Sequence, residues 1–267
     1  MPINLRPDAF SGTAAAYARY RPPYPPAMVA DLLSRAGVGS GLLVDLATGP
    51  GRIALDLAPR FEHVIAIDLE PDMIDVARGR AADGGITNVE WQVGRAEELG
   101  VAPAAVDLVT IGEAFHRLEQ SVIAAAAFDW LRPGGCLATL GTDGRFSGDV
   151  DWHVVIRAVR DRWLERVAPE AVELWLPSKG EGQTRREQVL AAAGFVDIEG
   201  HDFETVAELT FDDISGFLQS TSFCSRNVLR GQFDAFEADL RRELGADAKT
   251  RFTDTLGWGY TLARKPI

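Results

Sequence analysis

The sequence predicts an α/β fold with a doubly wound, mostly parallel sheet, and three observations support this. Short apolar runs typical of buried strands recur at 41–46, 63–68, 89–93, 106–111 and 135–141. Helical patterns separate them, notably 52–58, a segment that begins at Pro71, and 120–131. The first run also leads through a glycine turn directly into a helix. Strands that alternate with helices form parallel sheets covered on both faces.

The rest of the chain predicts helical additions to this core. Residues 13–36 have a helical pattern that the proline cluster at 21–26 interrupts, since proline removes a backbone donor. After about residue 142 we expect amphipathic helices and two more strands, at 149–167, 185–193, 195–203, 212–221, 227–244 and 251–264. We therefore predict an N-terminal helical lid (1–40), a cofactor-binding core (41–145) and a helical substrate cap with the remainder of the sheet (146–267).

Composition narrows the function classes. Asp and Glu number 39 against 27 Lys and Arg, for a net charge of −12, which disfavours nucleic acid and anionic membranes as partners. The excess is either a solubility feature or a preference for a cationic substrate. No apolar run approaches the roughly 20 residues of a membrane span, and no secretion signal is visible. Cys136 and Cys224 are far apart, which suits a reducing cytoplasm, and the scattered histidines and cysteines predict no metal site.

The glycine turn Gly49-Pro50-Gly51 follows the first strand and precedes a helix. Glycines allow close approach of a ligand to the backbone, and the helix start offers unpaired N–H groups. Asp68 ends the second strand, where ligands of doubly wound folds bind, so its carboxylate could accept both ribose hydroxyls. A tight turn without a ligand and a helix N-cap at Asp68 remain alternative interpretations.

Nicotinamide dinucleotides and S-adenosylmethionine share this layout, and three features favour the second. Asp45 stands just before the glycines, where a carboxylate repels a pyrophosphate but suits an ammonium group. The turn at 94–99 follows the third strand and is positioned to reach an adenine. The turn at 131–135 leads into the fifth strand, although Pro133-Gly134 is also an ordinary type II turn.

Together these motifs resemble the class I S-adenosylmethionine-dependent methyltransferases, and most of all the small-molecule branch that includes the ubiquinone and trans-aconitate methyltransferases. The matching segments are Tyr17 to Pro25, Val44 to Gly51, Asp68, Gly94 to Glu98, Val106 to Thr110 and Leu131 to Gly135. The resemblance covers about residues 10–141. It implies a Rossmann-like, mostly parallel seven-stranded sheet with helical cap insertions, and S-adenosyl-L-methionine as the cofactor.

The resemblance also implies roles for individual residues. The glycine turn would hold the methionine end of the cofactor, Asp68 the ribose, the third turn the adenine, and the N-terminal segment would close over it, with Arg21 a candidate for the carboxylate. In chain order the implied cofactor-binding residues are Tyr17, Tyr20, Arg21, Asp45, Ala47, Gly49, Gly51, Asp68, Leu69, Met73, Ala96, Glu97 and Gly112. Two positions depart from the family pattern: Ala47 replaces a glycine, and Arg95 replaces a common aspartate.

The segment after the fourth strand carries the candidate catalytic residues. His116 is a candidate general base, because its ordinary pKa is near neutrality, and Glu113 is a candidate for orienting the substrate. Alternatively His116 only packs, since a direct displacement at a sulfonium carbon needs positioning above all. The candidate substrate-binding residues are Glu113, His116, Phe146, Asp149, Asp151, Trp152 and His153, with Trp175 and Phe217 as further pocket walls.

We therefore expect a cytoplasmic methyltransferase, monomeric or homodimeric, that methylates a small molecule. An amine or aminosugar of natural-product metabolism, methylated on N or O, is the favoured acceptor, because Glu113, Asp149 and Asp151 are acidic. The alternatives are an NAD-dependent oxidoreductase, a non-catalytic binding module and a nucleic-acid methyltransferase. For the last, Arg21-Pro22-Pro23-Tyr24 lacks the Asp or Asn that would hold a flipped base. The segment 216–223 has no assigned role.

Overall fold

The computed structural model describes residues 10–169 and 181–267, including their side chains except those of 181–184. This part contains one seven-stranded sheet with the order β3-β2-β1-β4-β5-β7-β6. Its strands are β1 (Leu42–Leu46), β2 (His63–Asp68), β3 (Val89–Val93), β4 (Val106–Gly112), β5 (Leu131–Thr142), β6 (Val196–Leu209) and β7 (Phe252–Arg264).

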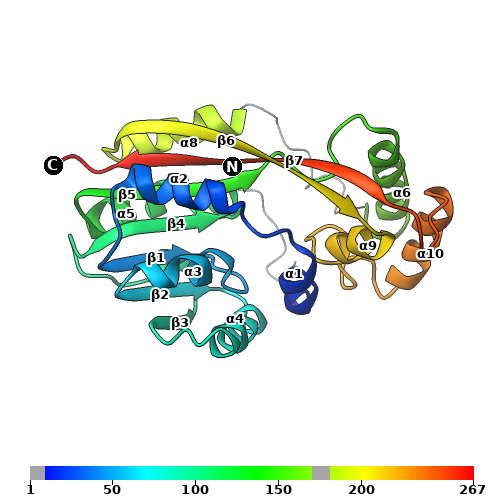
Figure 1. Cartoon of the computed structure of the whole chain (residues 1–267), viewed down its shortest axis with the longest axis horizontal. Coiled ribbons are helices and arrows are strands. Elements are labelled where there is room, and N and C mark those ends of the chain that lie inside the picture. Colours follow the sequence, from blue (N-terminus) through cyan, green and yellow to red (C-terminus); the bar gives the residue numbers. More distant parts are fainter. Residues whose placement is uncertain (1–9, 170–180) are drawn as a thin grey trace.

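Helices connect the strands and extend the fold at one end (Figure 1). The α-helices are α1 (Ala14–Tyr20), α2 (Pro26–Ala36), α3 (Arg52–Leu57), α4 (Pro71–Asp83), α5 (Gln120–Trp130), α6 (Asp151–Val167), α8 (Glu181–Ala192), α9 (Phe211–Gln219) and α10 (Phe233–Glu243). Short 3-10 turns are η1 (Ala58–Arg60), η2 (Ala96–Glu98) and η3 (Phe115–Arg117).

The expected doubly wound sheet is confirmed. Strands β1 to β5 pair in parallel, whereas β7 runs antiparallel to both β5 and β6. One buried layer joins the sheet to α2 and α3, through residues such as Met28 and Leu57, and α4 lies beside α3 on this face. The opposite layer joins the sheet to α5 and α8, through Ile123 and Leu190. Because β1 alternates between the layers, Leu43 and Val44 are both fully buried on opposite faces.

Three element boundaries differ from the sequence-based expectation. The predicted turn at 131–135 is the irregular start of β5, where the Gly134 N–H donates to the Lys265 carbonyl at 3.0 Å. Strand β6 continues to Leu209, because it pairs with β7 along most of its length. Helix α10 starts only at Phe233, because left-handed backbone at Arg230 (φ 50°) and Gly231 (φ 77°) ends the preceding turns.

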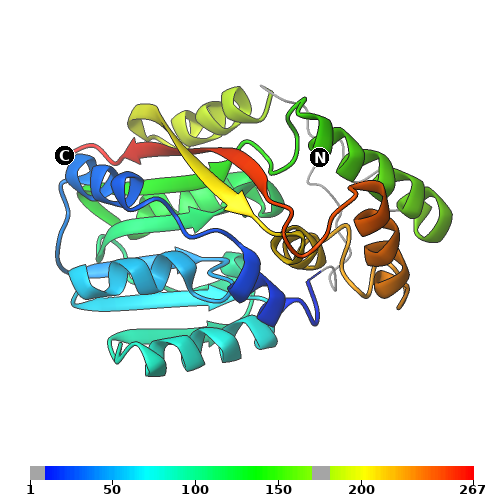
Figure 2. The same cartoon turned by 45° about the vertical axis from the view of Figure 1, so that its right-hand side comes forward.

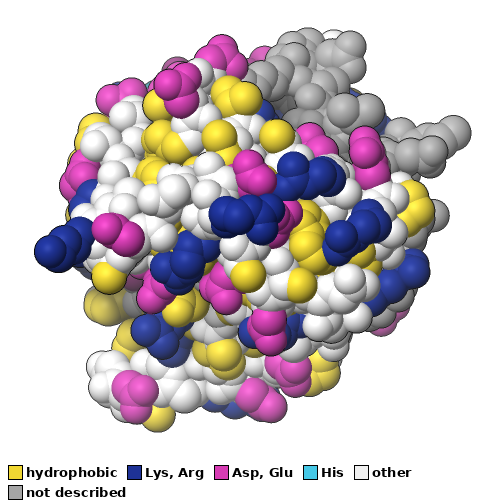
Figure 3. Space-filling model, turned by 90° about the vertical axis from the view of Figure 1, so that its right-hand side faces the viewer, with side chains coloured by type: hydrophobic (Ala, Val, Ile, Leu, Met, Phe, Trp, Pro, Cys, Tyr) yellow, Lys and Arg dark blue, Asp and Glu magenta, His cyan; other side chains and the backbone are white. Residues whose placement is uncertain are grey.

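The cap consists of α6, α9 and α10 and is carried by long extensions of β6 and β7 (Figures 1 and 2). It has a hydrophobic core of its own, in which Phe211, Phe233 and Phe236 are among the most deeply buried side chains. This third core explains why the apolar residues after position 142 do not continue the pattern of the sheet. On the outer side of the cap, arginines and acidic side chains are intermixed (Figure 3).

Helix α1 joins the core to the cap, whereas α2, within the expected lid segment, packs on the sheet. The backbone of α9 at Gly216 lies directly against the ring of Tyr20, so that a methyl group added to this glycine would approach the ring to 2.3 Å. The next residue of the chain, Arg21, donates from Nε to Ser220 Oγ at 2.8 Å. The segment 216–223 is therefore the surface that receives α1.

None of the helices in the described ranges is long and apolar enough to cross a membrane.

We predict that Gly216→Ala destabilises the fold by about 1–3 kcal/mol, the usual cost of forcing a methyl group into a packed site. Urea unfolding would measure the loss. The matched control is Gly79→Ala in α4, where the methyl group meets nothing within 4 Å and better helix propensity should stabilise by roughly 0.5–1 kcal/mol. Gly216→Ala combined with Tyr20→Ala should recover part of the loss. If Gly216→Ala increased the free energy of unfolding as much as Gly79→Ala does, the close contact between Gly216 and Tyr20 would be contradicted.

Candidate functional site

A cavity of about 240 Å³ lies at the carboxyl ends of β1, β2, β3 and β4. Its walls are Phe10, Tyr17, Ala47, Gly49, Ile67, Asp68, Leu69, Glu70, Met73, Gly94, Arg95, Ala96, Glu97, Gly112, Glu113, Ala114, Arg117 and Leu118. A smaller cavity of about 20 Å³ shares Tyr17, Ala47, Gly49 and Gly112 with it and adds Asp45 and Arg52. The structure thus brings most of the expected cofactor-binding residues together around one space.

A wider hollow of about 480 Å³ lies on α10 and the turn after it, between Asp234 and Ala246. It is an open surface depression far along the chain from the strand ends, and its charged walls pair with one another or with nearby groups. We therefore place the functional site at the strand ends.

The turn after β1 has left-handed backbone at three positions, with φ of 52° at Ala47, 56° at Gly49 and 75° at Gly51. At Gly51 a side-chain carbon would come within 2.7 Å of the Trp91 ring, so only glycine fits. Ala47 adopts the permissive conformation expected for its replacement of a glycine, at a cost of roughly 1–2 kcal/mol. The turn therefore exposes backbone with little side chain above it.

Asp45 lies beneath this turn and is buried, with 1% of its surface exposed. Its carboxylate accepts hydrogen bonds from Thr48 Oγ1 at 2.5 Å and Thr110 Oγ1 at 2.7 Å. Burial raises the pKa of Asp45 to about 6, although the two hydroxyls and the Ala54 amide act in the opposite direction. A cationic group in the small cavity would stabilise the charged form.

Asp68 connects the first two strand ends. Its carboxylate accepts the Gly49 N–H at 2.7 Å and the Glu70 N–H at 2.9 Å. Burial raises the pKa of Asp68, while the amides of Glu70, Gly49 and Leu69 oppose the shift. The carboxylate faces the cavity and has lone pairs left for a diol, since each oxygen accepts only one described bond.

One part of the cavity wall is apolar. Met73 is buried in this wall, and Leu69 is 49% exposed. Together they offer apolar surface on which a planar ring can pack. Glu97 accepts the Glu119 N–H at 3.1 Å, and Arg95 lies 3.4 Å from the Glu97 carboxylate. The implied adenine contacts of Ala96 and Glu97 stay a prediction.

Arg52 and Glu113 form a buried ion pair that the sequence analysis missed. Arg52 Nη1 lies 3.3 Å from Glu113 Oε2, and its guanidinium stacks 4.4 Å from the centre of the Tyr24 ring. It also donates to the Pro22 carbonyl, which ties the N-terminal segment to α3. The sequence signal was a cation at the start of an apolar helix, where the helix dipole disfavours it unless an anion is near.

Glu113 is held by this pair and does not face the cavity as a free acid. Its backbone is left-handed, with φ of 54°, and Oε1 accepts from Thr142 Oγ1 at 3.0 Å. Burial raises the pKa of Glu113, but Arg21, Arg52 and Thr142 together hold it below its ordinary value. Glu113 is therefore an ionised counter-charge to arginines.

The three N-terminal candidates occupy different positions. Tyr17 lines both cavities. Tyr20 packs on α9, and neither cavity includes it. Arg21 stacks between the rings of Tyr17 and Phe217, 4.7 and 4.5 Å from their centres. Arg52, which lines the small cavity, is thus the closer candidate for a cofactor carboxylate.

His116 lies beside the cavity without lining it. His116 is exposed to solvent, although chain segments crowd around its side chain. Burial by surrounding chain segments and the neighbouring Arg117 lower the pKa of His116 to about 4, so the imidazole is neutral at pH 7. Arg117 Nε donates to His116 Nε2 at 3.3 Å, which engages the atom that a base would use. Its role as a base stays a prediction.

The five candidates from the cap line neither cavity, and their role in substrate binding stays a prediction. Phe146 and His153 are buried in the cap, where His153 and Arg145 meet Asp254. Trp152 packs against Phe146 and Phe252, while Asp149 and Asp151 are exposed. The reason is that the third hydrophobic core buries Phe146 and packs against Trp152 at the start of α6, while the two aspartates stay on the surface. Trp175 lies outside the described residues.

In the described part of the chain, no group of three or more His, Cys, Asp or Glu side chains is arranged to hold a metal ion.

Comparisons with known proteins agree with this geometry. Residues 43–135 match a family model described as a methyltransferase domain. An uncharacterized methyltransferase of Mycobacterium tuberculosis is 27% identical over 81% of this chain and 77% of its own length. A ubiquinone/menaquinone biosynthesis C-methyltransferase of Rubrivivax gelatinosus is 29% identical over 60% of this chain and 64% of its own length.

Among solved structures, a protein of Anaeromyxobacter dehalogenans described as a type II methyltransferase aligns with a TM-score of 0.63 at 21% identity, covering 92% of this chain and 98% of that one. A Haemonchus contortus phosphoethanolamine N-methyltransferase in complex with S-adenosyl-L-methionine aligns with a TM-score of 0.53 at 17% identity, covering 98% of this chain and 57% of that one. At these identities the likeness establishes the fold.

We predict that Asp45→Asn raises the stability of the ligand-free protein at neutral pH. The folded-state pKa of about 6 lies above the unfolded value of 3.8, so stability from this group is present below pH 3.8 and is lost as pH rises through about 6. The variant should therefore match the wild type near pH 4 and gain on it up to about pH 7, by roughly 2–3 kcal/mol. Urea unfolding at several pH values measures this, and a difference that does not change with pH would contradict it.

Proposed function

We propose that this chain, which carries a methyltransferase domain of the class I fold, binds S-adenosylmethionine in the cavity at the strand ends and transfers its methyl group to a small molecule. The observation that carries the proposal is the placement of two carboxylates in the walls of two cavities that share four lining residues. Asp45 borders the small cavity beneath the glycine turn, and Asp68 borders the large one at the next strand end.

The residues present fit this cofactor better than a dinucleotide. The buried Asp45 suits an ammonium group, and Arg52 in the same small cavity suits a carboxylate. A pyrophosphate would instead need free amides at the turn, but the Gly49 N–H already donates to Asp68. The same buried Asp45 would repel its charge. An α-amino acid end of the ligand therefore belongs at the glycine turn.

The protein's contribution to methyl transfer is binding and positioning. Bound S-adenosylmethionine would supply an electrophilic methyl group on a sulfonium. Gly112, where a side chain would meet the Tyr24 hydroxyl, keeps the end of β4 open beside both cavities. Tyr17 closes the opposite wall, and the Arg52–Glu113 pair fixes the end of β4 to α3. Such alignment of reacting groups supplies a large part of the barrier reduction in displacements of this kind.

The acceptor is a small molecule, and O, N and C acceptor atoms all fit the proposal. The expected preference for an amine has lost its support, because Asp149 and Asp151 lie on the surface and Glu113 pairs with Arg52. The similar proteins align with most of this chain, but their names do not point to one class of methyl acceptor.

Calorimetric titration with S-adenosylhomocysteine and with NAD tests the cofactor directly. We expect the first to bind with a micromolar Kd or tighter and the second to bind negligibly. Incorporation of label from methyl-labelled S-adenosylmethionine into a metabolite extract would then identify the acceptor. Binding of NAD but not S-adenosylhomocysteine would overturn the proposal.

We further predict that Asp68→Asn weakens S-adenosylhomocysteine binding roughly 10- to 100-fold, since a neutral amide accepts the ribose hydroxyls less strongly than a carboxylate. The control is Asp83→Asn at the end of α4, which is exposed and lines neither cavity. Thermal unfolding of both variants checks that they are folded. Unchanged affinity in a folded Asp68→Asn protein would remove Asp68 from the site.

A further inference from the structure

Arg117 stands out in the wall of the large cavity because no carboxylate of the described residues lies within 4 Å of it. Its side chain is half-buried and is held from several sides. Nη2 donates to Ser222 Oγ at 3.2 Å, Nε donates to His116, and the guanidinium stacks 4.4 Å from the centre of the Phe10 ring. An arginine fixed in this way, half-desolvated and without a counter-ion, is a ready binding site for an anion.

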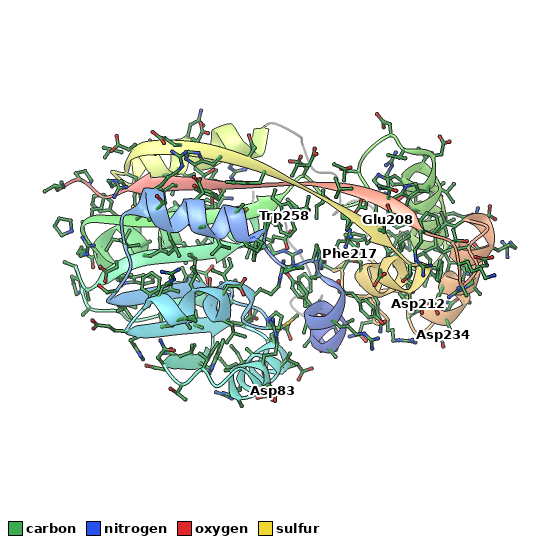
Figure 4. All side chains as sticks on the ribbon, viewed as in Figure 1. Asp83, Glu208, Asp212, Phe217, Asp234 and Trp258 are labelled. Atoms are coloured by element: carbon green, nitrogen blue, oxygen red, sulfur yellow. The ribbon has the colours of Figure 1, made fainter. Side chains whose placement is uncertain are left out.

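Arg21 adds a second cation to the same region. It donates to Ser220 and stacks on Tyr17 and Phe217, and it has no carboxylate within 4 Å among the described residues. Phe217 lies where α9 meets the rest of the molecule (Figure 4). Burial, with repulsion by Arg21, lowers the pKa of Arg117 to about 10, so the two charges act on each other and Arg117 remains protonated at pH 7.

The charges that act on Arg117 do not balance, although Asp68, Glu70 and Glu97 add carboxylates at and after the ends of β2 and β3 in the same cavity wall. Arg21, Arg52 and Arg117 all act on Glu113 or are acted on by it, and Glu113 is the carboxylate that they share. The carboxylate of the proposed cofactor would neutralise one more arginine, and Asp45 would neutralise its ammonium group. A positive charge then remains at Arg117, which is half-buried in the cavity wall, where electrostatic interactions are stronger than in bulk water.

We infer that Arg117, oriented by Ser222, binds a carboxylate or phosphate group of the methyl acceptor. The inference rests on the proposed function and names its substrate class, an anionic small molecule in place of the expected amine. The planar guanidinium would present two N–H groups to the two oxygens of such an anion. The segment 216–223 gains a role, since its two serines hold Arg21 and Arg117 at the cavity.

The overall charge of −12 does not conflict with this site. Acidic side chains are spread over the surface, and beside the cavity Glu97 and Glu98 each pair with Arg95. An exposed acidic surface is screened within about 8–10 Å at physiological salt, whereas Arg117 acts at contact distance.

The test uses three probes of similar shape, namely benzoate, phenyl phosphate and benzylamine, titrated into the protein saturated with S-adenosylhomocysteine. We expect benzoate or phenyl phosphate to bind at least tenfold more tightly than benzylamine, and the tighter of the two identifies the anion. Arg117→Gln should weaken that binding roughly 10- to 100-fold, Arg117→Lys less, and Ser222→Ala severalfold. Arg60→Gln, which removes an exposed arginine outside both cavities, should have no effect.

Cofactor binding separates the two proposals. Thermal unfolding checks that Arg117→Gln is folded, and its affinity for S-adenosylhomocysteine is measured first so that the probes are titrated into a saturated protein. Preference for benzylamine, absence of binding by all three probes to a protein that binds S-adenosylhomocysteine, or equal anion binding by the Gln variant would each overturn the anion site. If the wild type fails to bind S-adenosylhomocysteine, the proposed function fails, and selectivity of the ligand-free protein for the anions still tests Arg117.

Discussion

The hydrogen-bonded carboxylate of Asp45 is the interaction on which the site depends. Parallel pairing sets Asp45 of β1 opposite Thr110 of β4, and the hydroxyl of Thr110 donates to it from the neighbouring strand. Thr48 donates from the glycine turn, so one buried charge ties two central strands to the loop that leads into α3. Burying a carboxylate is costly, and the raised pKa of Asp45 shows that these bonds offset the cost only in part. The remaining cost is the kind that a functional site retains, because a bound cation would remove it.

Near this charge, several arginine guanidinium groups pack against aromatic rings. Arg52 lies over Tyr24, Arg21 lies between Tyr17 and Phe217, and Arg145 faces Phe217 from the cap. Each arginine thereby spans two parts of the chain that are distant in sequence. Cation–π contacts of this kind contribute up to about 2 kcal/mol each when desolvated. They join lid, core and cap while keeping positive charge near the strand ends, so the same side chains that close the structure also determine its electrostatics.

The sequence predicted those features that the geometry of a parallel sheet determines. Asp45 and Asp68 end adjacent strands, and the carboxyl ends of parallel strands meet at one edge, so their convergence followed from the order of the strands. The left-handed conformation of Ala47 agrees with the family resemblance, in which this residue replaces a glycine. Arg52 was missed because its partner Glu113 is far away in the sequence and no local pattern connects them.

The cap candidates could not be placed for a different reason. Phe146 and His153 have the composition of a pocket wall, but the direction in which α6 faces depends on a separate hydrophobic core built with α9 and α10. The partner of His153, Asp254, comes from β7, about a hundred residues further along the chain. Side-chain chemistry alone does not reveal which face of an inserted helix turns inward, whereas strand alternation does.

The pH dependence of S-adenosylhomocysteine affinity tests the role of Asp45 most directly. The ammonium group of the ligand needs the ionised carboxylate, and the pKa of Asp45 in the free protein is about 6. The association constant, measured by calorimetry between pH 5 and 8, should be level above about pH 6.5 and fall toward tenfold per pH unit below about pH 6. In Asp45→Asn this dependence should disappear together with most of the affinity. A wild-type affinity that is constant from pH 5 to 8, or an Asn variant that binds equally well, would contradict the account.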